Sequence, residues 1–80
     1  MPQKISPRQN QVLNLVRDRF DGEMDASPEN YRQIADEIGW KNYGGVQDCL
    51  FALRAKGAVW SVGSIAFPTK WIAKDAQANL

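Results

Sequence analysis

The side chains best suited to recognising another molecule gather around Gln47. Its amide can form two hydrogen bonds with adenine, and the carboxylate of the neighbouring Asp48 can accept one from the amino group of cytosine. Asn42 and Tyr43 carry polar groups that reach base edges or phosphates, and Gly44 allows a close backbone approach. If this segment is a helix that enters the major groove of DNA, we expect these five residues to read bases.

Basic residues lie around this set and offer contacts to phosphate groups. Lys41, Arg54 and Lys56 lie near the two ends of the segment, and Lys70 follows in the next part of the chain, where Ser64 adds a weaker hydrogen-bonding contact. Such contacts position a protein on a duplex without reading its sequence. The alternative is that these side chains are ordinary exposed surface, as lysines commonly are.

The charge is distributed unevenly along the chain, although the formal net charge is only +1. Residues 1–17 contain basic residues and no acid, whereas residues 18–37 contain seven acids against two arginines. From residue 41 onward the basic residues again outnumber the acidic ones. Because phosphate attracts cations, we expect the N-terminus and the later elements to face DNA, and the acidic middle to face away.

Two Ser-Pro pairs mark the starts of helices. Ser6-Pro7 is followed by Gln9, which is the spacing of a capping box, and Ser27-Pro28 repeats the pattern of cap and proline. Apolar residues recur at helical spacing after each pair, and each series ends near a glycine. The expected helices span residues 7–20 and 28–38, with the acidic segment between them expected to be a loop.

The second half of the chain predicts one further helix and a hairpin. Val46, Leu50 and Leu53 form the buried stripe of a helix over residues 43–56, for which Asn42 is a suitable N-cap. Residues 58–73 are rich in β-branched and aromatic types and contain turn signals, so we expect a β-hairpin there.

These elements form the plan of a single domain over residues 1–80. The fold class is α+β, mainly α, with three helices and a C-terminal β-hairpin in the arrangement of a winged helix-turn-helix. The helix over residues 43–56 is then the recognition helix, and the hairpin is the wing. Topology alone does not establish DNA binding, because similar three-helix folds also dock proteins.

The sequence resembles the N-terminal DNA-binding domain of the LexA repressor family over residues 4–73. The matching positions are Ser6, Pro7, Arg8, Gln9, Val12, Ile34, Ala35, Gly39, Leu50, Ala52, Leu53, Lys56, Gly57 and Val59. The resemblance implies a small bacterial or phage transcriptional regulator, repressor-like, with duplex DNA as its partner. Because one module this small buries little DNA surface, we also expect a homodimer, at least on DNA.

Two departures from the family limit what the resemblance carries over. The family's recognition helix starts with a Ser-Pro-Asn type of segment, whereas residues 42–45 here are Asn-Tyr-Gly-Gly, so we expect a different operator. The family's self-cleaving domain has no counterpart in these 80 residues, so we expect no autoproteolysis from them. An excised domain and a stand-alone regulator both fit.

Composition argues against several other classes of function. The chain has one cysteine, Cys49, and no histidine, so we expect no disulfide, no metal site and no cofactor. No nucleophile and base pair stands out, and the domain is too small for a substantial pocket, so we expect neither an enzyme nor a small-molecule substrate. Without a signal peptide or a long apolar run, we expect a cytoplasmic protein that does not contact membranes.

Phe51 is the residue that fits the DNA-binding interpretation least well. A helical wheel places it beside Gln47 and Asp48 on the outward face, where it should be largely exposed. It can pack under the hairpin, meet a thymine methyl, or anchor a protein interface, and we expect packing because aromatic side chains are more often buried. The alternative function is therefore a protein-interaction module, such as a phage-encoded inhibitor or antirepressor. The low net charge and the acidic segment favour it.

Overall fold

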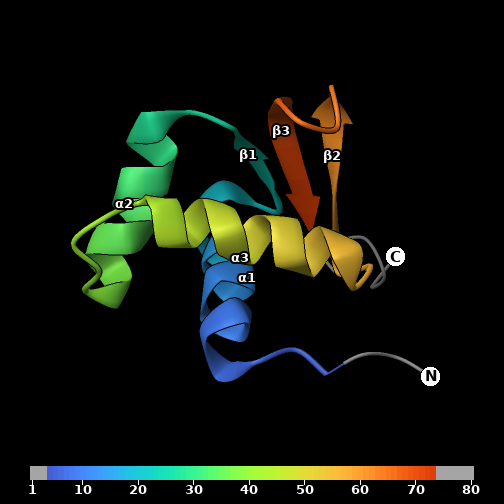
Figure 1. The fold of residues 1–80 in the computed structure, drawn as a ribbon. Coiled ribbons are helices and arrows are strands. Elements are labelled where there is room, and N and C mark those ends of the chain that lie inside the picture. The colour runs from blue at the N-terminus through green and yellow to red at the C-terminus, as the bar shows by residue number, and fades with distance from the viewer. Residues whose placement is uncertain (1–3, 74–80) are drawn as a thin grey trace.

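The computed structural model describes residues 4–73 and contains three helices and three strands (Figure 1). Their order is α1 (Pro7–Phe20), β1 (Glu23–Asp25), α2 (Pro28–Ile38), α3 (Gly44–Ala55), β2 (Val59–Gly63) and β3 (Pro68–Ala73). Three helices followed by a hairpin confirm the predicted fold class. Within residues 4–73, no helix is long and apolar enough to cross a membrane.

Local capping explains where α1 and α2 begin. The Ser6 hydroxyl accepts a hydrogen bond from the Gln9 amide at 3.2 Å, and the Gln9 side chain accepts one from the Ser6 amide at 3.2 Å, which completes a capping box. At the start of α2 the Ser27 hydroxyl accepts a hydrogen bond from the Asn30 amide at 3.3 Å. Gly39 closes α2 with a φ of +91°, a conformation that glycine adopts without strain.

The sheet contains a strand that the sequence analysis missed. The acidic segment after α1 was expected to be a loop, but β1 pairs antiparallel with β3, with Met24 opposite Trp71, and the strand order is β1-β3-β2. In β1 only Met24 points inward, between the exposed Glu23 and Asp25. Three residues are too few to show an alternating pattern, and the pairing partner lies far along the chain, so the sequence carried no local signal.

The third helix differs slightly from its expected bounds and cap. It spans Gly44–Ala55 rather than residues 43–56, and its N-cap is Tyr43, not Asn42. The Tyr43 backbone is already close to helical, and its carbonyl accepts from the Val46 amide at 3.0 Å. Among the described residues, no side chain caps the first turn of α3. The Gln47 amide also donates to the Tyr43 carbonyl, so among the described residues it is the first two amides of the helix, those of Gly44 and Gly45, that are left for another partner.

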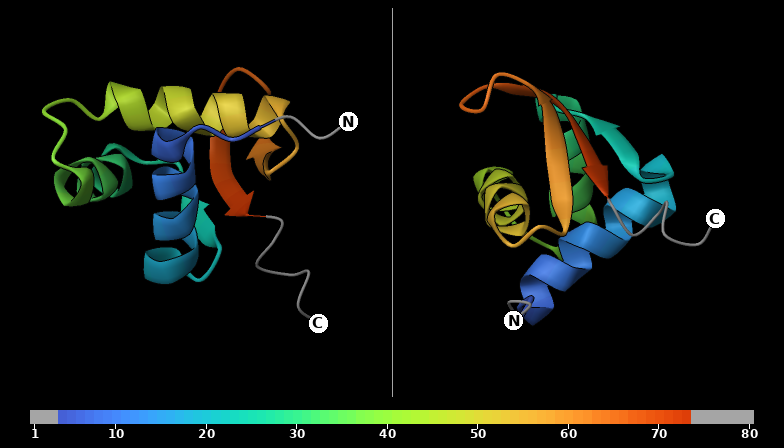
Figure 2. Two further views of the ribbon diagram at one scale, coloured as in Figure 1. Left: turned by 90° about the horizontal axis from the view of Figure 1, so that it is seen from below. Right: turned by 90° about the vertical axis from the view of Figure 1, so that its right-hand side faces the viewer.

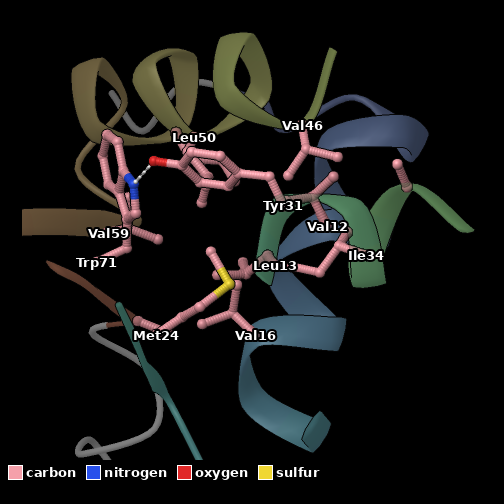
Figure 3. Packing of buried hydrophobic residues seen from close by; sticks show 13 residues of the cluster. Val12, Leu13, Val16, Met24, Tyr31, Ile34, Val46, Leu50, Val59 and Trp71 are labelled. Atoms are coloured by element: carbon pink, nitrogen blue, oxygen red, sulfur yellow. Dashed lines mark hydrogen bonds between the residues drawn. The ribbon is translucent and has the colours of Figure 1, made fainter. Parts of the chain in front are cut away.

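The core lies where the three helices meet the inner face of the sheet (Figure 3). Trp71 is fully buried, and its indole Nε1 donates a hydrogen bond to the Tyr31 hydroxyl at 2.9 Å. Burial of the hydroxyl raises the pKa of Tyr31, although the bond from Trp71 opposes this shift. The buried cluster consists of Val12, Leu13, Val16, Met24, Tyr31, Ile34, Ala35, Val46, Leu50, Leu53, Val59, Trp71 and Ala73.

Candidate nucleic-acid interface

The two glycines at the start of α3 have different surroundings. A Cβ atom on Gly45 would lie 3.2 Å from the ring of Trp40, so the glycine lets that ring pack against the first turn. A Cβ atom on Gly44 would meet no described atom within 4 Å. Gly44 is exposed and therefore presents bare backbone toward solvent.

The predicted base-reading residues come together at this end of α3. Asn42, Gly44 and Asp48 are exposed, and Gln47 and Tyr43 are half-buried. The Tyr43 ring stacks on Tyr31, with 6.0 Å between the ring centroids, so its aromatic face is occupied by packing. Asn42, Gln47, Asp48 and the Gly44 backbone remain accessible, together with the exposed Lys41.

Two hollows border this surface on either side of α3. One is lined by Arg8, Trp40, Asn42, Gly45 and Cys49. The other lies between α3, the start of α2 and the hairpin turn, and includes Tyr31, Tyr43, Gln47, Ala66, Phe67 and Pro68. A partner that contacts Gly44 and Asp48 would therefore meet α1 on one side and the hairpin turn on the other.

Two arginines near this surface were not among the predicted site residues. The Arg8 guanidinium lies over the Trp40 ring, 5.8 Å from its centroid, and the Arg32 guanidinium lies 5.7 Å from the Tyr43 centroid. Both side chains belong to exposed residues on α1 and α2. Only the three-dimensional fold brings these cations to the N-terminal end of α3.

The predicted cations at the C-terminal end of α3 are held by other parts of the domain. Arg54 donates to the Ser61 hydroxyl at 2.7 Å, and its guanidinium lies 4.8 Å from the centroid of Phe51 and 5.6 Å from that of Trp71. Lys56 donates to the Gln9 side chain of the α1 capping box at 2.6 Å. These contacts join α3 to β2 and α1.

The helical wheel had indicated that Phe51 is largely exposed, but the structure shows that it is not. It is half-buried and meets Trp71 edge to face, with ring centroids 5.2 Å apart and planes at 87°. The hairpin lies against this side of α3, which a helical wheel drawn from one segment cannot include. Of the three fates open to Phe51, the contact with Trp71 corresponds to packing under the hairpin.

The hairpin residues predicted to contact phosphate do not lie together. Lys70 lies one position before the buried Trp71 on β3, so it points to the opposite, outer face, and it pairs with Glu23 at 3.6 Å. Ser64 is exposed in the turn, where its hydroxyl accepts a hydrogen bond from the Phe67 amide at 3.4 Å. Ser64 therefore lies near the α3 surface through the turn, whereas Lys70 is on a different face.

Cys49 lines the hollow beside Arg8, but its environment does not favour a thiolate. Burial raises the pKa of the Cys49 thiol, and the nearby Asp48 carboxylate raises it further. Among residues 4–73, no group of three or more His, Cys, Asp or Glu side chains is arranged to hold a metal ion.

Comparisons with known proteins agree with the resemblance in sequence. A family model of the LexA DNA binding domain matches residues 2–63, which is more than half of the chain. The LexA repressor of Herminiimonas arsenicoxydans is 38% identical over 56 residues, which cover 70% of this chain and 25% of the repressor. The chain thus spans about a quarter of the matched relative, and no solved structure gives a significant match. On this evidence the chain belongs to the LexA DNA-binding domain family.

Proposed function

We propose that this chain is the sequence-specific duplex-DNA-binding part of a bacterial or phage transcriptional regulator of the repressor type. The observation that carries the proposal is the N-terminal half of α3. There the polar groups of Asn42, Gln47 and Asp48 flank the bare backbone of Gly44. This combination of amide, carboxylate and open backbone suits the edges of base pairs in the major groove.

The cations around α3 support contacts to the DNA backbone. Lys41, Arg8 and Arg32 surround the N-terminal end of the helix, and the uncapped amides of its first turn add partial positive charge. The acids of α2 and β1 include Glu37, which pairs with Arg19 at 2.9 Å, and Glu23, which pairs with Lys70. Such a division of charge would orient the domain as it approaches a duplex.

Among the predicted phosphate contacts, Lys41 has the strongest support. Arg54 and Lys56 already make hydrogen bonds inside the domain, so a phosphate contact from either would share or replace those bonds. Lys70 would reach DNA only if the duplex extended to the outer face of the sheet. Because three of the predicted cations are poorly placed, we propose that Arg8 and Arg32, which lie near the start of α3, also contact phosphate groups.

A homodimer on DNA completes the proposal. One α3 contacts only a few base pairs, and domains of this size reach tight specific binding by occupying paired half-sites. Footprinting should then show two half-sites related by approximate two-fold symmetry. A footprint of a single half-site, saturated by one molecule, would contradict the dimer and leave the DNA-binding proposal intact.

The function is tested by selecting duplexes from a randomised pool and measuring their affinity by gel shift at several salt concentrations. If about three phosphates are neutralised per protomer, the logarithm of the binding constant should fall against the logarithm of salt with a slope of about −3. No recovered duplex at low salt, or an affinity that salt does not change, would contradict the proposal. Binding would then be sought to protein partners, which is the alternative function.

A further inference from the structure

The turn of the hairpin carries two large apolar side chains that are exposed to solvent. Ile65 is 78% exposed and Phe67 is 80% exposed. Residues 62–68 contain no charged side chain at all. Neighbouring exposed apolar residues on a small domain usually mark a contact with a partner.

Hydrogen bonds and backbone geometry give this turn a defined shape. The Ser64 hydroxyl accepts from the Phe67 amide, and the Thr69 hydroxyl donates to the Val62 carbonyl at 3.3 Å. Gly63 has a φ of +93°, and a Cβ there would lie 3.1 Å from Thr69, so the turn depends on glycine. Ile65 and Phe67 therefore project from a formed turn, which lowers the entropy cost of inserting them into a partner.

The turn projects on the same side of the molecule as α3. In the right-hand view of Figure 2 the hairpin bends so that its tip lies above the end of α3, on that side of the domain. Phe67 also lines the same hollow as Gln47 and Tyr43. A duplex that holds the N-terminal half of α3 in its major groove would bring an adjacent groove to the tip.

We propose that Ile65 and Phe67 enter the minor groove of the bound duplex and wedge between base pairs, so that the DNA in the complex is bent. This inference rests on the proposed DNA-binding function. Apolar side chains of these types can unstack base steps and kink a duplex by roughly 20–90°. The wedge adds affinity without releasing counterions, because the turn has no cation to neutralise a phosphate. The family match ends at residue 63, before this turn.

The test compares the chain with an I65S/F67S variant on the duplex that the unaltered chain selects from a randomised pool. Energy transfer between dyes at the two ends of that duplex reports the bend, and gel shift reports affinity and salt slope. We expect the variant to bind about ten- to a hundredfold more weakly and to lose most of the bend, because the loss of two apolar burials is partly offset by the cost of unstacking that the variant no longer bears. The salt slope and melting temperature should not change. Trp60→Ser, which removes a half-exposed aromatic from the strand that precedes the turn, should keep affinity and bend.

A second variant separates a wedge from an ordinary backbone contact. Phe67→Arg should make the salt slope steeper by about 1, since a phosphate is now neutralised, while the bend stays lost. If I65S/F67S binds and bends DNA like the unaltered chain, the tip does not contact DNA, and loss of self-association in that variant would assign it to a protein interface. Failure of the unaltered chain to select any duplex would overturn the DNA-binding proposal itself, and this inference with it.

Discussion

The two halves of α3 differ in what surrounds them. The N-terminal half has the open backbone of Gly44 and the accessible polar groups of Gln47 and Asp48. The C-terminal half is fastened to the sheet, because Phe51 packs on Trp71 and Arg54 bonds to Ser61. One continuous helix thus has one half free to contact a partner and one half that fixes its position. A helical wheel shows only the faces of the helix and would treat both halves alike.

The largest effect on the fastened half is expected from Phe51→Ala. The edge-to-face contact with Trp71 and the Arg54 stacking are both lost, and we expect a loss of about 2–3 kcal/mol in the free energy of unfolding. Urea denaturation measures this loss. Asp48→Ala, on the exposed side, is the control and should change stability little. An unchanged urea midpoint for Phe51→Ala would mean that the contact with Trp71 is not part of the stable core.

A smaller effect is expected from Tyr31→Phe, which removes one hydroxyl from the core. The Trp71 indole Nε1 then loses its acceptor while it stays buried, so we expect a loss of about 1–2 kcal/mol. Thermal or urea unfolding measures it. An increase in stability would show that the Trp71 Nε1 finds another acceptor in the variant.

Arg54→Lys tests whether that cation supports the fold or contacts phosphate. Lysine keeps the charge but loses the planar group that lies over the rings of Phe51 and Trp71. We expect a loss of stability of about 1 kcal/mol, the size of one hydrogen bond, with no change in the salt slope of DNA binding when the charge is kept. Arg54→Gln completes the test, because a salt slope shallower by about 1 in that variant would place Arg54 on a phosphate.

Lys70→Ala should have the smallest effect. Its ion pair with Glu23 is exposed and long at 3.6 Å, and such pairs contribute about 0–1 kcal/mol. Because Lys70 lies on the outer face of the sheet, we expect DNA affinity and salt slope to stay unchanged. Lys41→Ala, by contrast, should weaken binding to all duplexes and make the salt slope shallower. A uniform loss of affinity of Lys70→Ala for all duplexes would show that the DNA reaches that face.

The features predicted correctly from the sequence are those set by neighbours along the chain. The Ser6 and Gln9 pair fixes the start of α1 through contacts three residues apart, and Gly39 ends α2 by its own backbone preference. Strand β1 was missed because it pairs with β3, which lies far along the sequence. The pattern of residues within a short segment does not indicate a pairing with a distant strand.

The same distinction explains the candidate interface. The polar residues from Asn42 to Asp48 were predicted as base contacts because they lie close together in sequence at the start of a predicted helix. Arg8 and Arg32 were not predicted to lie near this surface. The aromatic rings that they contact, those of Trp40 and Tyr43, belong to other parts of the chain. Lys70 was predicted to contact phosphate from the wing, but the sequence does not show which face of its strand packs on the core.

The central claim, that the free half of α3 reads DNA sequence, is tested most directly with Gln47→Ala. Its affinity is measured by gel shift on the duplex selected by the unaltered chain and on an unrelated duplex of equal length, with the urea midpoint measured alongside. We predict a loss of about 1–3 kcal/mol on the selected duplex only, with the unrelated duplex and the urea midpoint unaffected. Equal losses on both duplexes, or no loss on either, would contradict the claim that this half of α3 reads bases.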